Sequence, residues 1–150
     1  MEIKGIVHTG VVVKDIHAAI DFYHNVLGLD VYEDVGEWVT DYEEVHAMGM
    51  DHDCLHRIAT LQTAEGSKVE LVQFEDPRDL PGADAPDFNG RHHISFLVDD
   101  IQAWVEKLKE YDIEPFLAPL SYETEDAEGG VAYWMQFRDP FGVIVEMMQY

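Results

Sequence analysis

The sequence predicts an α+β protein in which a βαβββ module occurs twice. Short runs rich in β-branched residues alternate with segments of helical periodicity, and this order repeats along the chain. A segment rich in Pro, Gly and Asp, residues 75–90, separates the two halves. A chain of 150 residues is long enough for one well-packed core. We therefore expect one domain made of two modules, about 1–74 and 91–150, joined by the 75–90 linker.

The first module opens with a predicted strand at residues 5–13, GIVHTGVVV, which is apolar and rich in valine. Asp15 is a typical helix N-cap, and apolar residues then recur at helical spacing up to Gly28, a typical C-terminal stop. Three further strands of this module are predicted at 29–35, 55–63 and 67–74.

The second module repeats this order. A strand is predicted at 91–98, and an N-cap follows at Asp99 or Asp100. The predicted helix after the cap carries apolar residues at helical spacing, namely Ile101, Trp104, Val105 and Leu108. The remaining strands are predicted at 113–118, 130–137 and 143–149.

Histidine occupies the same place in both modules. His8 precedes Asp15 by seven residues, and His93 precedes Asp100 by seven residues. Each histidine lies in an apolar run that is predicted to be the first strand of its module. This correspondence indicates that the two histidines are equivalent parts of a duplicated unit.

Glutamate recurs in the same way, four residues after a glycine in GSKVE (66–70) and in GVIVE (142–146). Side chains of a strand alternate between its two faces, so both glutamates share a face with apolar residues. Burying a bare carboxylate there is costly unless a cation or a proton compensates it. Two imidazoles and two carboxylates together form a typical site for a divalent metal. The repeat therefore suggests one metal held by His8, Glu70, His93 and Glu146.

The simpler alternative is that each of these side chains has a structural or solvent-facing role on its own strand, so that no metal binds. Among the other histidines, His17 and His24 lie on the first predicted helix, where we expect them to contact solvent. His46, His52 and His56 flank the segment VHAMGMDHDCLH. They could hold a second metal, but we favour a mobile loop near the mouth of the site.

The charge balance excludes some partners. The chain has 31 acidic and 9 basic residues, a formal net charge of −22, which disfavours nucleic acid and anionic membrane surfaces.

No apolar stretch approaches the length of a membrane span, and no basic, apolar leader opens the chain. A lone cysteine, Cys54, fits a reducing compartment. We expect a cytoplasmic protein.

Four segments together resemble one known group of proteins. They are VHTGVVVKDIHAAIDFYHNVLGL, KVELVQ, HHISFLVDDI and FRDPFGVIVEMMQ. The chain resembles the vicinal oxygen chelate superfamily, which includes glyoxalase I, methylmalonyl-CoA epimerase, extradiol dioxygenases, and fosfomycin- and bleomycin-resistance proteins. The resemblance implies paired βαβββ modules that curl into a cleft-shaped, barrel-like mixed sheet. It also implies metal ligands at His8, Glu70, His93 and Glu146.

The ligand set helps to sort the members of this superfamily by chemistry. Extradiol dioxygenases have an iron triad that would correspond to His8, His93 and Glu146, with Glu70 as a surplus carboxylate. A fourth protein ligand better suits a metal that chelates two vicinal substrate oxygens and stabilises an enediolate. Glyoxalase I enzymes resemble this His/Glu/His/Glu set, whereas the epimerases commonly have Gln at the first Glu.

The positions that bind glutathione in the glyoxalases differ here. Bacterial glyoxalase I enzymes typically have an arginine four residues after the first ligand and an asparagine four residues after the second, where this chain has Val12 and Phe74. The basic residues also form no obvious phosphate cluster for coenzyme A. A small, partly apolar substrate is therefore expected, in a pocket lined by Val12, Val72, Phe74, Leu97 and Met148.

The sequence and the resemblance together predict a divalent-metal-dependent lyase or isomerase of the glyoxalase type. It would remove a proton next to a carbonyl of a small molecule with vicinal oxygens, with Glu146 as the first choice of base and Glu70 as the second. The ion would be Ni, Co, Zn, Mn or Fe. The alternatives are glutathione-dependent glyoxalase I, an epimerase of the methylmalonyl-CoA type, an extradiol dioxygenase, or a resistance or binding protein of the same fold. We also expect a homodimer.

Overall fold

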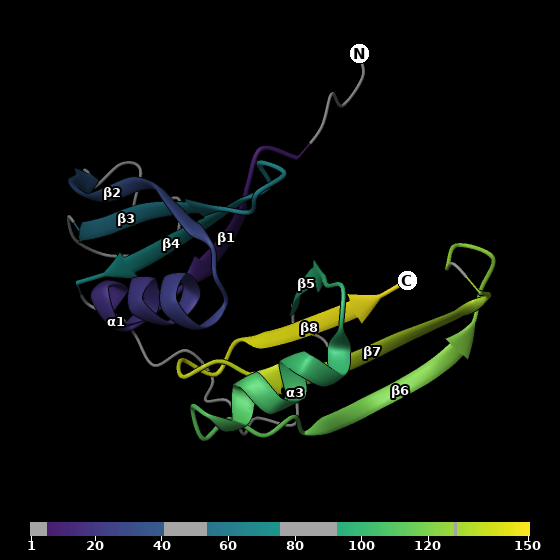
Figure 1. The fold of residues 1–150 in the computed structure, drawn as a ribbon. Helices are drawn as coiled ribbons and strands as arrows, with labels where there is room; N and C mark the ends of the chain where they lie inside the picture. The colour runs from purple at the N-terminus through teal and green to yellow at the C-terminus, as the bar shows by residue number, and fades with distance from the viewer. Residues whose placement is uncertain (1–5, 41–53, 76–92, 128) are drawn as a thin grey trace, which may run out of the picture. The chain divides into compact units, whose positions relative to one another are not determined.

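The computed structural model describes residues 6–40, 54–75, 93–127 and 129–150, and the chain divides into two compact units, Met1–Leu80 and Pro81–Tyr150 (Figure 1). All but the first residue of the predicted 75–90 linker lies outside the described residues.

The first unit contains a four-stranded mixed sheet with helical segments on one face (Figure 1). Its strands lie in the order β1-β4-β3-β2, with β1 parallel to β4 and the other neighbours antiparallel. The elements are β1 (Thr9–Val12), α1 (Ile16–Asp21), the π-helical turn η1 (Phe22–Val26), β2 (Asp30–Thr40), β3 (Cys54–Gln62) and β4 (Lys68–Phe74).

The second unit has the same topology, with the strand order β5-β8-β7-β6 and β5 parallel to β8. The helix α3 lies on one face of this sheet (Figure 1). The elements are β5 (His93–Leu97), α3 (Ile101–Lys109), β6 (Leu117–Glu123), β7 (Val131–Arg138) and β8 (Ile144–Gln149). The prediction of an α+β protein in which a βαβββ module occurs twice is thereby confirmed.

The first helix begins where the sequence predicts it. One carboxylate oxygen of Asp15 accepts hydrogen bonds from the backbone N–H groups of His17 and Ala18, as an N-cap residue does. The N–H of Ile16 donates to the side-chain oxygen of Gln73, at the end of β4, over 2.8 Å. The helix start is therefore tied both to its own cap and to the last strand of the unit.

The second unit repeats this arrangement with equivalent residues. Asp100, rather than Asp99, is the N-cap, and its carboxylate accepts from the N–H groups of Gln102 and Ala103. The N–H of Ile101 donates to the side-chain oxygen of Gln149, at the end of β8, over 2.9 Å. The duplication thus extends to the contacts that fix each helix against its sheet.

The cores lie between each helix and the sheet face that it covers. In both sheets the buried residues alternate with more exposed ones along the last strand, as at Val69 and Leu71 in β4 and at Val145 and Met147 in β8. The intervening glutamates, Glu70 and Glu146, therefore lie on the opposite face, which we call the open face of each sheet. The largest fully buried side chains are Tyr23, Phe137, Ile16, Leu61, Leu71, Ile101, Leu108, Met135, Met147 and Val145.

One predicted strand is placed too early. The sequence predicts a strand at 113–118, but β6 begins only at Leu117. The reason lies in the end of α3, where Asp112 has a left-handed backbone (φ 58°) and the N–H of Ile113 donates to the carbonyl of Leu108. These residues close the helix end and reverse the chain, so they are not available for strand pairing.

The strand predicted at 29–35 is longer than expected, because β2 continues to Thr40. Its pairing with β3 shifts register twice between Val31 and Gly36, which indicates bulges.

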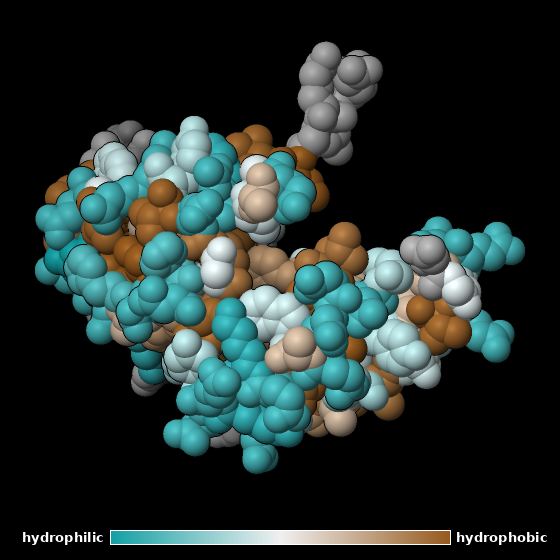
Figure 2. Space-filling view, in the orientation of Figure 1, coloured by the Kyte–Doolittle hydropathy of each residue, from teal (hydrophilic) through white to brown (hydrophobic). Residues whose placement is uncertain are grey.

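Large apolar side chains remain exposed in both units, among them Trp38, Leu97 and Leu120, and hydrophobic patches interrupt the hydrophilic surface in Figure 2. Among the described residues, no helix is both long and apolar enough to span a membrane.

Candidate metal site

In the first unit, β1 and β4 bring one histidine and one glutamate together. His8 comes directly before β1, and Glu70 lies in β4 opposite Gly10. Nε2 of His8 is 3.6 Å from Oε1 of Glu70. The two side chains are 42% and 25% exposed, respectively, so they are accessible from the open face of this unit.

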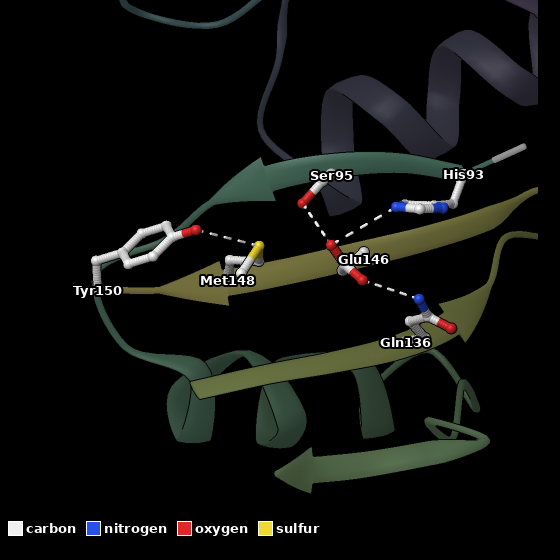
Figure 3. Close-up of polar contacts among 6 residues, drawn as sticks. All are labelled: His93, Ser95, Gln136, Glu146, Met148 and Tyr150. Carbon is white, nitrogen blue, oxygen red and sulfur yellow. Dashed lines mark hydrogen bonds and ion pairs between the residues drawn. The ribbon is translucent and has the colours of Figure 1, made fainter. Parts of the chain in front are cut away.

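In the second unit, the equivalent strands bring together the equivalent pair. His93 is the first residue of β5, and Glu146 lies in β8 opposite Ser95. Nε2 of His93 is 3.7 Å from Oε1 of Glu146 (Figure 3). The side chain of His93 is 47% exposed and that of Glu146 only 13%. The two pairs thus match in register and in separation, but the second glutamate is more enclosed.

The carboxylate of Glu146 is held from two sides (Figure 3). The hydroxyl of Ser95, on β5, donates to Oε1 over 2.9 Å. The side-chain amide of Gln136, on β7, donates to Oε2 over 2.8 Å. Both oxygens of Glu146 therefore accept a hydrogen bond from a neighbouring strand, which fixes the orientation of the carboxylate.

The positions around Glu70 carry different residues. Gly10 takes the place of Ser95, and Thr60 takes the place of Gln136 across from the glutamate. Gly10 has no side chain, and the hydroxyl of Thr60 donates instead to Glu33 over 3.2 Å. Within the described part of the chain, no hydrogen bond reaches the Glu70 carboxylate, whose one polar contact is His8.

These pairs have the chemistry of a divalent-metal site. Imidazole nitrogen and carboxylate oxygen are suitable ligands for ions such as Zn²⁺, Ni²⁺ and Co²⁺. Separations of 3.6 and 3.7 Å suit two neighbouring ligands that each lie about 2.0–2.2 Å from one ion. Each unit supplies two such ligands, and the described residues contain no cluster of three or more. Each pair contains two of the four ligands that the sequence predicts, and the full set stays a prediction.

The other histidines that the structure describes lie elsewhere in the first unit. His17 and His24 are exposed on the first helical segment, and Nδ1 of His24 is 2.7 Å from the carbonyl oxygen of Leu29. His56 lies in β3, where its ring stacks on Trp38 and also lies near the ring of Phe74. His46 and His52 lie outside the described residues, so the second metal or mobile loop considered for that segment is untested.

The predicted pocket residues share the open faces with the two pairs. Cross-strand register places Val12, Val72 and Phe74 on the face of Glu70, and Leu97 and Met148 on the face of Glu146. Val12 and Leu97 are exposed, and the other three are half-buried. Both pairs therefore lie beside apolar surface.

Two tyrosines of the second unit were not singled out by the sequence. The hydroxyl of Tyr150 donates to Sδ of Met148 over 3.8 Å (Figure 3). A side-chain hydrogen bond with Tyr150 raises the pKa of Tyr122, and the charge of Glu146 makes a smaller contribution in the same direction. Tyr122 lies on β6, the edge strand of this sheet.

Sequence reasoning also did not identify Ser95 and Gln136 as partners of Glu146. The alternation of side chains along β5 places Ser95 on the same face as His93, so the sequence does indicate the face of the strand on which Ser95 lies. Gln136 could not be found in this way, because its contact depends on the register between β7 and β8.

Comparison with known proteins agrees with this fold. The model of the Glyoxalase/Bleomycin resistance protein/Dioxygenase superfamily matches residues 5–147, and the chain belongs to that superfamily. The resemblance to the vicinal oxygen chelate group is thereby confirmed.

Individual relatives are distant. The chain is 29% identical over 141 residues to YwbC of Bacillus subtilis strain 168, an uncharacterised protein, covering 89% of this chain and 96% of that one. It is similar in fold to a glyoxalase family protein from Bacillus cereus, with a TM-score of 0.72, 20% identity, and coverage of 99% and 95% of the two chains. It is also similar to a glyoxalase/dioxygenase from Nostoc punctiforme, with a TM-score of 0.65, 20% identity, and coverage of 97% and 90%.

Proposed function

We propose that this protein is a divalent-metal-dependent lyase or isomerase that removes a proton next to a carbonyl group of a small molecule with two vicinal oxygens. The observation that carries the proposal is the pair of equivalent His–Glu contacts, His8–Glu70 and His93–Glu146, on the open faces of two duplicated sheets. A structural or solvent-facing role for each side chain alone does not explain why both pairs recur at the same register.

The four residues of the two pairs would hold one divalent ion, of Ni, Co, Zn, Mn or Fe. When bound, such an ion supplies electrostatic stabilisation for negative charge that develops on a substrate oxygen. The protein's own residues supply the ligands, orient the substrate against the open faces, and accept the proton. A positioned proton acceptor of this kind contributes about 10²–10⁴-fold to the rate.

One of the two glutamates would take the proton from the substrate carbon. Glu146 is the residue that the sequence favours, and Glu70 is the second choice. Both lie on open faces, and both are accessible in their own unit. Proton transfer requires a carboxylate that can move toward the substrate while the other three ligands stay in place.

The surroundings of the pairs support a small and partly apolar substrate. Val12 and Phe74 stand where an arginine and an asparagine would hold glutathione, and the net charge of −22 disfavours a tripeptide with two carboxylates. Leu97 and Met148 extend the apolar surface beside the second pair. Glutathione and coenzyme A thioesters are therefore the less favoured substrates.

Metal analysis followed by a substrate screen tests this proposal. Protein purified without chelators is expected to retain a divalent metal, and a screen of α-keto, α-hydroxy and thioester compounds is expected to find a small carbonyl compound that it turns over. Metal-dependent uptake of dioxygen with a catechol would instead identify an extradiol dioxygenase. Tight binding of a compound without metal and without turnover would identify a binding protein and contradict the proposal.

A further inference from the structure

The two glutamates lie at equivalent positions, yet the residues that face them across the neighbouring strands differ. Ser95 and Gln136 donate to the two oxygens of Glu146, whereas Gly10 and Thr60 at the matching positions donate nothing to Glu70. The exposed fractions of the side chains follow the same pattern, at 13% for Glu146 and 25% for Glu70.

We propose that Ser95 and Gln136 are positioning residues that hold Glu146 in one orientation, so that the His93–Glu146 pair is the pre-organised half of the metal site and the His8–Glu70 pair is the adaptable half. This inference rests on the proposed metal site. It assigns different roles to two carboxylates that the sequence treats as equivalent.

The physical reason is the cost of ordering a ligand. A carboxylate that is already oriented by two hydrogen bonds loses little conformational freedom when an ion binds, whereas an unsupported one must be immobilised at that moment. Hydrogen-bond partners of metal ligands typically contribute about 10–100-fold to metal affinity. Ser95 and Gln136 act in this way through Glu146, and neither needs to touch the ion.

A consequence follows for the proton acceptor. Glu146 cannot leave its position without breaking two hydrogen bonds, whereas Glu70 is not held in this way by the described residues. Under this division Glu70 is the carboxylate that can move toward a substrate, and Glu146 remains a fixed ligand. The preference for Glu146 as the base, which the sequence suggests, is thereby reversed.

Metal affinity of the purified full-length chain tests the inference without any substrate. Zn²⁺ is titrated in competition with a chromophoric chelator, for the wild type and for Ser95→Ala and Gln136→Met, which each remove one donor. Both variants are expected to bind Zn²⁺ about tenfold more weakly. Ser95 is exposed and Gln136 is only half-buried, and thermal unfolding is measured in parallel to check that the fold is retained.

Two controls separate positioning from a general structural effect. Ser95→Thr keeps the hydroxyl and is expected to restore the wild-type affinity. Thr60→Val changes the residue that matches Gln136 in the first unit and is expected to leave the affinity within about twofold, because Thr60 donates to Glu33 rather than to Glu70. Equal weakening in Ser95→Thr and Ser95→Ala would contradict the inference.

Adding a hydrogen-bond donor beside Glu70 in the first unit should strengthen metal binding instead of weakening it. A Cβ atom at Gly10 would have no heavy atom within 4 Å apart from its chain neighbours, so the strand has room for Gly10→Ser, which adds a hydroxyl opposite Glu70. This variant is expected to bind Zn²⁺ more tightly than the wild type, because the adaptable carboxylate then gains a donor.

The possible failures are distinguishable. Wild-type protein that binds neither Zn²⁺ nor Ni²⁺ would overturn the proposed function, and the inference with it. Wild-type protein that binds Zn²⁺, together with unchanged affinities in Ser95→Ala, Gln136→Met and Gly10→Ser, would overturn the inference alone.

Discussion

Glu70 and Glu146 show how much the surroundings of one residue type decide its role. Both lie in the last strand of a module, and both contact a histidine at nearly the same distance. Only Glu146 has hydrogen-bond donors on both neighbouring strands. The alternation of the strands predicts which face each glutamate occupies, but the cross-strand donors depend on register and could not be inferred from the sequence.

Removal of the Glu70 side chain tests whether it is one of the four proposed metal ligands. Glu70→Ala is expected to lower metal content strongly, because it deletes one of four proposed ligands and leaves His8 without its partner. The measurement is elemental analysis of the protein after identical purification of wild type and variant. Unchanged metal content in Glu70→Ala would remove Glu70 from the ligands.

The roles of the two carboxylates are separated by conservative replacements. Glu70→Gln is expected to abolish turnover of a substrate found by screening while metal stays bound, because an amide oxygen can still be a ligand but an amide cannot accept the proton. Glu146→Gln is expected to weaken metal binding more than Glu70→Gln does. Turnover near the wild-type rate in Glu70→Gln would return the base assignment to Glu146.

At the scale of elements, the helix starts and the strand faces were predictable because their causes are local. Asp15 and Asp100 cap the helices through residues two and three positions further along the chain. The start of β6 was not predictable from local propensity. The closing contact of α3 through Ile113 uses residues that otherwise favour a strand, and β6 also contains a proline, which its place at the sheet edge tolerates.

The two caps give a stability prediction. Asp15→Ala and Asp100→Ala are each expected to lower the free energy of unfolding by about 1 kcal/mol, because two backbone N–H groups lose their acceptor. Urea denaturation measures this change, with Glu114→Ala, an exposed acidic residue outside the helices, as the matched control. A loss in the control as large as in the cap variants would contradict the assignment of the effect to capping.

Truncation of a buried side chain between helix and sheet should lower the free energy of unfolding more than the loss of a cap does. Leu71 and Leu108 are fully buried, one in β4 and one in α3. Replacing either with alanine is expected to lower the free energy of unfolding by about 2–5 kcal/mol, from lost apolar burial and the cavity that remains. Denaturation of Leu97→Ala, a substitution of an exposed leucine on an open face, should show a much smaller loss. Equal losses for buried and exposed leucines would contradict the assignment of the core.

For the whole molecule, the duplicated sequence predicted the duplicated topology, because each half carries its own strand and helix pattern. The exposed apolar side chains of both units, including Trp38 and Leu97, are of the kind that a partner surface covers. We therefore predict a homodimer in solution. Light scattering at micromolar concentration would measure this, and a mass near the 17.1 kDa of one chain, with metal bound, would contradict it.

Metal stoichiometry decides whether one ion is held by ligands from both units, as we propose. Zn²⁺ is titrated into metal-free wild type, His8→Ala and His93→Ala, and the bound metal per chain is determined by elemental analysis after desalting. One ion per chain is expected in the wild type, with strong loss of that ion in both variants, because each variant lacks a ligand of the same site. Two ions per chain, or a full complement in either variant, would contradict it.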